Sequence, residues 1–156
     1  MASVWKLDRL SRFFMKFYGG QRYQTSPNTP LRLPLNECSV ALITTAGFFL
    51  DGQHPFEKGD CSYREIPNSI PTQALINGHK SAACDERGIE VDPNLAFPLD
   101  RFRELETEGK IGSLNDRHFS FMGSITKPHR LIKQTAPEVA QMLKADGVGV
   151  AFLTPV

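Results

Sequence analysis

The sequence predicts an α/β fold in which an open, mainly parallel sheet carries helices on its faces. Three short apolar segments are typical of buried strands, two segments between them have the spacing of amphipathic helices, and the two kinds of element alternate over residues 38–156. Such alternation favours parallel strands joined by right-handed crossovers, as in Rossmann or flavodoxin-like sheets. A chain of 156 residues is long enough for one such domain with a real core.

Two segments precede this domain. Residues 1–20 predict an amphipathic helix that ends at two glycines, with charges on one side and these apolar residues near helical spacing on the other: Trp5, Leu10, Phe13, Phe14 and Phe17. Such a helix packs on its own domain or on a partner, or less often lies on a membrane surface. Residues 21–37 contain three prolines without periodicity and predict an extended linker.

The first strand is predicted over residues 39–45, an almost entirely apolar run that ends in a turn at Ala46 and Gly47. Residues 47–97 follow without regular periodicity and with Gly, Pro and Asp throughout. A structureless stretch of that length is unusual inside a compact domain. It therefore predicts functional surface, with short strands near residues 61–66.

Clearer signals for helices and strands follow. A helix is predicted over residues 98–108, with proline at its first position and glycine after its end. A short strand is predicted over residues 118–122. A second helix is predicted over residues 135–145, because Thr135 as N-cap and Glu138 have the spacing of a capping box.

Composition and charge argue against several classes of protein. The 18 Lys and Arg residues nearly balance the 17 Asp and Glu residues, and this near-neutral charge does not favour nucleic-acid binding. No apolar run approaches the roughly 20 residues that span a bilayer. The three cysteines have neither disulfide-framework nor zinc-site spacing, which fits a reducing, cytoplasmic compartment: Cys38, Cys61 and Cys84.

Ligands of open parallel sheets bind outside the carboxyl ends of the strands. Here these ends are residues 44–47, residues 122–124 and, after a third strand predicted over residues 148–153, residues 154–156. The predicted substrate-binding residues at these ends are Thr44, Thr45, Gly47, Met122, Gly123 and Thr154. Because a parallel strand needs a covering crossover helix, we expect the sheet to be incomplete at the C-terminus; the alternative is a last strand that simply completes it.

The motifs of residues 38–156 together resemble the selenoprotein-B family of glycine, sarcosine, betaine and D-proline reductases. Any one motif would be weak evidence, but their shared order along the chain is specific. The matching segments are Val40–Gly47, Gly59–Pro67, His79 with Asp85, Asn94–Arg101, Leu105–Gly112, His118–Gly123, Ala136–Ala140, Lys144–Val148 and Leu153–Val156.

The resemblance implies that a selenocysteine or cysteine follows directly after Val156, usually with a second cysteine a few residues later. We therefore expect that the codon after Val156 is UGA, a selenocysteine codon that was translated as a stop. The alternative is a natural stop codon and a genuinely short protein. The chain is expected to hold no cofactor of its own. As given, it would be the N-terminal portion of a reductase domain and would lack its nucleophile.

The resemblance also implies the reaction and its partners. A selenolate or thiolate attacks carbon in a reductive cleavage of a C–N bond α to a carboxylate, and a neighbouring thiol resolves the adduct. The substrate is a small amino-acid-like molecule related to glycine, betaine or proline. A pyruvoyl group on a separate subunit captures the amine, so a partner subunit and a thiol reductant are expected. An open sheet edge would also favour self-association.

Candidate catalytic residues lie mainly in the long irregular stretch. By resemblance, His79 and Asp85 predict a general acid/base with its orienting carboxylate; a solvated loop histidine is the alternative. His118 is predicted to face the cleft as a third catalytic residue. Arg64 could hold a substrate carboxylate with its bidentate fork, although a surface salt bridge is favoured. Cys61 is predicted to be a small buried residue rather than a redox group.

Two other functions stay open at this point. The chain could be a non-catalytic α/β binding or assembly module, with its N-terminal helix docking a partner. A flavodoxin-like nucleotide or flavin binder is the weaker alternative. The sequence lacks G-x-G-x-x-G after the first strand, and residues 44–47 would make a poor phosphate loop.

Overall fold

The structure is a computed structural model that describes residue 13 and residues 29–80 and 86–156. The chain divides into two compact units, residues 1–30 and Leu31–Val156, and the second unit contains the α/β domain. Apart from Phe13, the predicted N-terminal helix lies outside the described residues. No helix in the described part of the chain is both long enough and apolar enough to cross a membrane.

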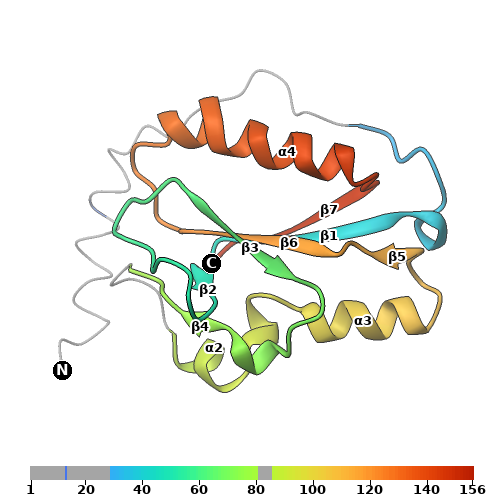
Figure 1. Ribbon diagram of the computed structural model, residues 1–156, viewed down its shortest axis with the longest axis horizontal. Coiled ribbons are helices and arrows are strands. Elements are labelled where there is room, and N and C mark those ends of the chain that lie inside the picture. The colour runs from blue at the N-terminus through green and yellow to red at the C-terminus, as the bar shows by residue number, and fades with distance from the viewer. Residues whose placement is uncertain (1–12, 14–28, 81–85) are drawn as a thin grey trace. The chain divides into compact units, whose positions relative to one another are not determined.

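A five-stranded sheet forms the centre of the domain (Figure 1). β1 (Ser39–Thr44) lies parallel to β6 (Arg117–Phe121) and the short β5 (Ser113–Leu114) along one edge, and parallel to β7 (Val150–Thr154) along the other. β3 (Tyr63–Pro67) pairs antiparallel with β6. The prediction of a mainly parallel α/β sheet is confirmed. β1, β6 and β7 are the three predicted strands, and β3 corresponds to the short strand predicted near residues 61–66.

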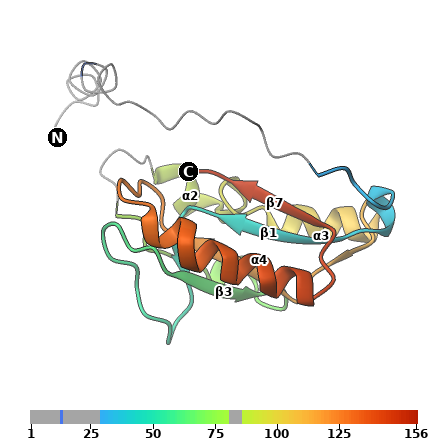
Figure 2. The same ribbon diagram turned by 90° about the horizontal axis from the view of Figure 1, so that it is seen from above.

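β1 is apolar almost throughout because both of its faces are covered. Val40 and Leu42 belong to the core on the side of α3 (Leu99–Thr107), whereas Ala41 and Ile43 belong to the core on the side of α4 (Ala136–Ala145). Figures 1 and 2 show α4 on one face of the sheet and α3 on the other. Burial on both faces explains why this strand lacks the polar alternation of a half-exposed strand.

The helix after β6 begins earlier than predicted. The chain is helical from residue 129, and a π-helical segment, η4 (Leu131–Thr135), leads directly into α4. Thr135 has helical dihedral angles and no capping bond; its hydroxyl donates to Cys61 O at 2.7 Å. The predicted cap at Thr135 is therefore wrong. The widened turn precedes Pro137, whose ring and missing N–H disturb a regular α-helix at this position.

The long stretch between β1 and α3 is more regular than predicted. β2 (Phe48–Phe49) pairs antiparallel with β4 (Ile76–Asn77), and β3 lies between them in the sequence. The short elements that follow β3 are η2 (Thr72–Ala74), α2 (Arg87–Val91) and η3 (Pro93–Leu95). Two-residue strands and single helical turns show no hydrophobic period, so sequence patterns do not reveal them.

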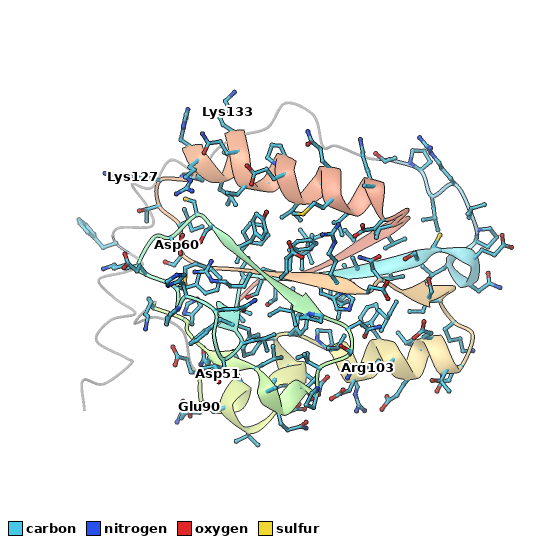
Figure 3. The ribbon with its side chains drawn as sticks, in the orientation of Figure 1. Asp51, Asp60, Glu90, Arg103, Lys127 and Lys133 are labelled. Carbon is cyan, nitrogen blue, oxygen red and sulfur yellow. The ribbon has the colours of Figure 1, made fainter. Side chains whose placement is uncertain are left out.

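Asp100 connects this stretch to the start of α3. Its carboxylate accepts bonds from Thr72 Oγ1 at 2.6 Å and Asn94 Nδ2 at 3.0 Å, and it pairs with Arg103 at 2.9 Å. Arg103, which Figure 3 labels near α3, in turn donates to the carbonyl oxygens of Asn68 and Ile70. The network joins η2, η3 and the loop after β3 to α3, so Asp100 has a structural role.

Candidate functional site

The carboxyl ends of β1, β6 and β7 are tied together by backbone bonds. Thr45 N–H donates to Thr154 O at 3.1 Å, and Gly47 N–H donates to Phe121 O at 2.8 Å. Ala46 and Met122 form an additional bridge, and Met122 is buried. The three chain segments predicted to carry the site thus meet at one edge, because parallel strands end on the same side of a sheet.

Val156 is held at this edge by the side chain of Thr45. Val156 N–H donates to Thr45 Oγ1 at 2.8 Å, and the same hydroxyl lies 3.4 Å from Val156 O. The chain leaving β7 therefore has a defined position beside the end of β1.

His79 packs against two glycines at the same edge. A methyl group at Gly123 would lie 2.8 Å from His79 Nε2 and 2.9 Å from both Thr45 O and Val156 O. At Gly47, which has φ of +70°, a methyl group would lie 3.2 Å from His79 N. Glycine at these positions allows the imidazole, the β1 end and the β7 end to approach the backbone closely.

Asn77 and Glu86 determine the surroundings of His79. Asn77 Oδ1 accepts from His79 N–H at 3.0 Å, and Asn77 Nδ2 donates to Glu86 Oε2 at 3.1 Å. Burial lowers the pKa of His79, and the carboxylate of Glu86 partly opposes this shift. A neutral imidazole is the form that accepts a proton. Asn77 was not predicted, although the Asn77-Gly78 dipeptide before the histidine is a turn signal.

Thr44 and Thr154 are direct register partners at the ends of β1 and β7. Thr44 is fully buried, and its hydroxyl donates to Ala96 O at 2.7 Å while accepting from Ala46 N at 3.1 Å. Thr154 Oγ1 is buried and has no hydrogen-bond partner among the described residues. Thr44 therefore supports the strand end from within the core.

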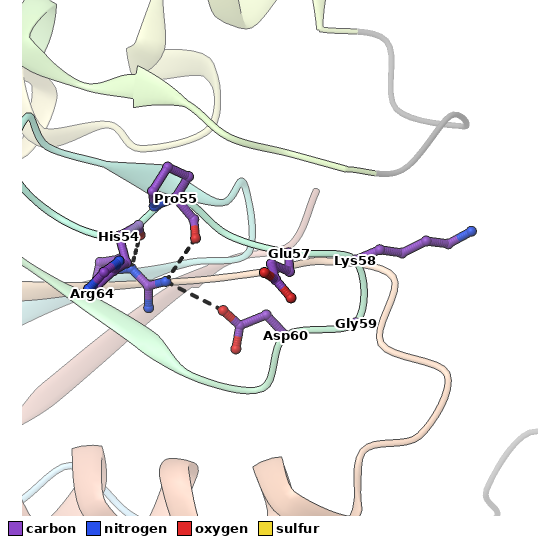
Figure 4. Close-up of a pocket in the computed structure, with 7 residues that line it drawn as sticks. All are labelled: His54, Pro55, Glu57, Lys58, Gly59, Asp60 and Arg64. Carbon is purple, nitrogen blue, oxygen red and sulfur yellow. Dashed lines mark hydrogen bonds and ion pairs between the residues drawn. The ribbon is translucent and has the colours of Figure 1, made fainter.

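Arg64 lies elsewhere and binds its own loop (Figure 4). Its guanidinium donates to His54 O at 2.6 Å and to Pro55 O at 3.3 Å, and it pairs with Asp60 at 3.4 Å. It also stacks 4.1 Å from the centre of the Phe56 ring. The pocket of about 440 Å³ beside it is lined by charged groups and carbonyls of this loop. A substrate carboxylate would have to compete with these bonds, and the geometry does not join Arg64 to His79.

His118 is placed in the core rather than at the strand ends. It is fully buried, its Nδ1 accepts from Leu42 N–H at 3.1 Å, and its ring meets Phe97 edge-on with centroids 5.9 Å apart. Burial, and secondarily the charge of Arg103, lowers its pKa to about 4. Met122 lies four residues further along the chain, which in extended backbone is a span of about 13 Å.

Of the remaining candidates, those that the structure describes bring no further group to this edge. Asp85 lies outside the described residues. Cys38 and Cys61 are free and buried, and Cys61 Sγ lies 3.9 Å from Lys127 O. Among the residues that the structure describes, no cluster of three or more His, Cys, Asp or Glu side chains is arranged to hold a metal ion.

Comparison with known sequences identifies relatives over most of the chain. The family described as glycine/sarcosine/betaine reductase selenoprotein B matches residues 21–156. The D-proline reductase subunit gamma of Acetoanaerobium sticklandii is 33% identical over 127 residues, which are 81% of this chain and 52% of that protein. No solved structure shows significant similarity.

Two further relatives are subunits of complexes. The betaine reductase complex component B subunit beta of Peptoclostridium acidaminophilum is 26% identical over 94% of this chain and 36% of its own length. The glycine reductase complex component B subunit gamma of Carboxydothermus hydrogenoformans is 38% identical over 82% of this chain and 30% of its own length. The chain thus spans about half or less of the curated relatives that it matches.

Proposed function

The chain belongs to the glycine/sarcosine/betaine reductase selenoprotein B family, and we propose that it forms the strand-end part of a site for reductive cleavage of a small amino-acid-like substrate. One observation carries this proposal. His79 Nε2, Thr45 O and Val156 O come so close to the backbone of Gly123 that a methyl group on this glycine would lie within 2.9 Å of all three atoms. In this arrangement a titratable side chain lies at the carboxyl edge of a parallel sheet, where ligands of such sheets bind.

The selenolate or thiolate expected after Val156 would supply the soft nucleophile. The described residues fit such a group, because Thr45 holds Val156 at 2.8 Å and because His79 Nε2 and Val156 O both approach the backbone of Gly123. His79 would hold or accept the proton of a selenol or thiol, since its lowered pKa keeps the imidazole neutral near pH 7. Asp85 is proposed to orient the imidazole.

Substrate contacts are proposed at the backbone and side-chain groups of this edge. Gly47 and Gly123 lie against His79, and Thr45 lies beside Gly123. Thr44 and Met122 support this edge from the core, and of these five residues only Thr45 is not buried. Thr154 has a buried hydroxyl without a partner among the described residues and is available to a polar group at the edge. The substrate class is glycine-, betaine- or proline-like.

A partner subunit with a pyruvoyl group and a thiol reductant would complete the reaction. The printed names of two relatives, which describe them as subunits of reductase complexes, support a multi-subunit assembly. Dithiol chemistry and the free cysteines Cys38 and Cys61 fit a cytoplasmic location. A non-catalytic assembly module is the second candidate function, and the exposed side chains of β7 favour it.

The experiment begins with the codon after Val156. We expect UGA, followed by a frame that encodes cysteine; UAA, UAG or no such frame would contradict the proposal. The chain is then produced with cysteine at that codon and the downstream frame, and thiol-dependent substrate reduction is measured with the partner subunit. His79→Ala should lower the rate at least tenfold and remove a pH dependence that His54→Ala retains. An extended protein that is inert but binds a partner tightly would favour the assembly module.

A further inference from the structure

The two edges of the sheet differ in chemistry. β3 forms one edge and carries Arg64 and Glu65 before it ends at Pro67, and charges and proline are features with which natural proteins protect an exposed edge. β7 forms the other edge, and its sequence VAFLT contains no charge and no proline (Figure 2). Within residues 29–80 and 86–156, β7 pairs only with β1. It has the composition of an interior strand in the position of an edge strand.

The backbone of β7 offers bonding groups on its open side. Thr154 O accepts from Thr45 N–H at 3.1 Å, so Thr154 directs its backbone toward β1. The direction of the backbone N–H and C=O groups alternates along a strand. The backbone groups of Phe152 therefore also point toward β1, whereas those of Ala151 and Leu153 point away from it. Both of these residues are exposed.

Apolar side chains are exposed on both faces of this edge. Phe152 is 42% exposed on the α3 face, where its ring lies 4.8 Å from that of Phe102. Leu153 points to the opposite face and is 65% exposed. A partner that supplied only one strand would leave both side chains in water. Covering them needs apolar layers on both sides of the added strand, as in an α/β unit.

We propose that β7 docks an α/β unit from the part of the selenoprotein B family's polypeptide that these 156 residues do not match. A strand of that unit pairs with Ala151 and Leu153, and its flanking layers cover Phe152 and Leu153. The length of the relatives supports this occupant, because the chain spans 52% of the D-proline reductase subunit and 30% of the glycine reductase subunit. The inference rests on family membership and not on the proposed chemistry.

The test uses the full 156-residue chain and, as probe, the segment of the Acetoanaerobium sticklandii D-proline reductase subunit gamma that the chain does not match. We expect a complex in which the amides of Ala151 and Leu153 become protected from hydrogen exchange. Ala151→Pro removes an outward N–H but no bond to β1, and should weaken binding at least tenfold. Ala151→Val keeps that N–H and should bind as the unchanged chain does.

A second pair of variants covers the case in which the proline variant does not fold. Leu153→Lys should weaken binding at least tenfold, while Ile132→Lys, which changes an apolar side chain 47% exposed on η4, should not. No complex, or a complex insensitive to Ala151→Pro and Leu153→Lys, would overturn the proposal. A concentration-dependent dimer of the chain that Ala151→Pro abolishes would assign the edge to a second copy and also overturn it. These readouts do not depend on enzymatic activity.

Discussion

Thr45 and Val156 bind each other across the carboxyl ends of β1 and β7. Val156 N–H donates to Thr45 Oγ1 at 2.8 Å, and Thr45 N–H donates to Thr154 O at 3.1 Å. The backbone and the side chain of one residue therefore hold the whole segment after β7. Val156 O and His79 Nε2 both approach the backbone of Gly123, so this pair of bonds places the end of the segment close to the imidazole.

Thr45→Val keeps the branched shape of the side chain and removes its bonds to Val156. We expect hydrogen exchange of the Val156 amide to become at least tenfold faster, with a loss of about 0.5–1.5 kcal/mol in the free energy of unfolding. Thr45→Ser restores the hydroxyl and should restore the slow exchange. Equal exchange rates in Thr45→Val and the unchanged protein would contradict the role given to this bond.

Gly123→Ala places a methyl group where His79 and two carbonyl oxygens already lie. We expect it to lower the free energy of unfolding by about 1–3 kcal/mol, measured by urea denaturation, because the backbone oxygens cannot move away freely. The imidazole resonances of His79 should shift in the same variant. Gly149→Ala is the control, since its nearest atoms would lie at 3.4 Å, an ordinary contact. A Gly123→Ala protein as stable as the control would count against the close packing.

His118 should make stability depend on pH. Its pKa is about 4 in the folded protein against 6.5 for the free side chain, so the unfolded state binds the proton more tightly. The free energy of unfolding should therefore fall by up to about 3 kcal/mol as the pH falls from 6.5 to 4. In His118→Gln this part of the pH dependence should disappear, whereas His129→Gln should retain it. Parallel stability curves for His118→Gln and the unchanged protein would disprove the assignment.

Asp100→Asn tests the network that joins the long loop to α3. Burial raises the pKa of Asp100, but the bonds from Thr72, Asn94 and Arg103 outweigh this and lower it below 3.8. The carboxylate therefore stabilises the fold above that pH, and the effect is lost as the pH falls through the lowered pKa. We expect Asp100→Asn to cost about 1–3 kcal/mol at pH 7.

The cost of Asp100→Asn should shrink below pH 3.8, which urea denaturation at several pH values would reveal. Glu104→Gln is the control, because this glutamate pairs with Arg101 on the surface, where both side chains are more than half exposed. Its effect should stay below about 1 kcal/mol. A cost of Asp100→Asn that does not vary with pH would mean that the charge is not what the network uses.

Local patterns were sufficient to predict most of the elements that build the sheet, but not the short β5. The apolar runs over residues 39–45, 118–122 and 148–153 correspond to β1, β6 and β7, and the helix predicted over residues 98–108 corresponds to α3. The meeting of their carboxyl ends also follows from the sequence, because parallel strands end at one edge. The start of the second helix was predicted too late. Thr135 lies inside the helix, and its hydroxyl donates to Cys61 O instead of capping the helix.

The side chains at the strand ends required the tertiary structure. His79 follows β4, a two-residue strand that is too short to show a hydrophobic period. Its position beside Gly123 depends on the pairing of β2 with β4 and on the bond from its N–H to Asn77. His118 and Arg64 have the residue types of a site, but one is enclosed by the core and the other by its own loop. The periodicity of a sequence determines which face of an element is buried. Which side chains meet is decided by strand register and loop closure, which depend on contacts distant in the chain.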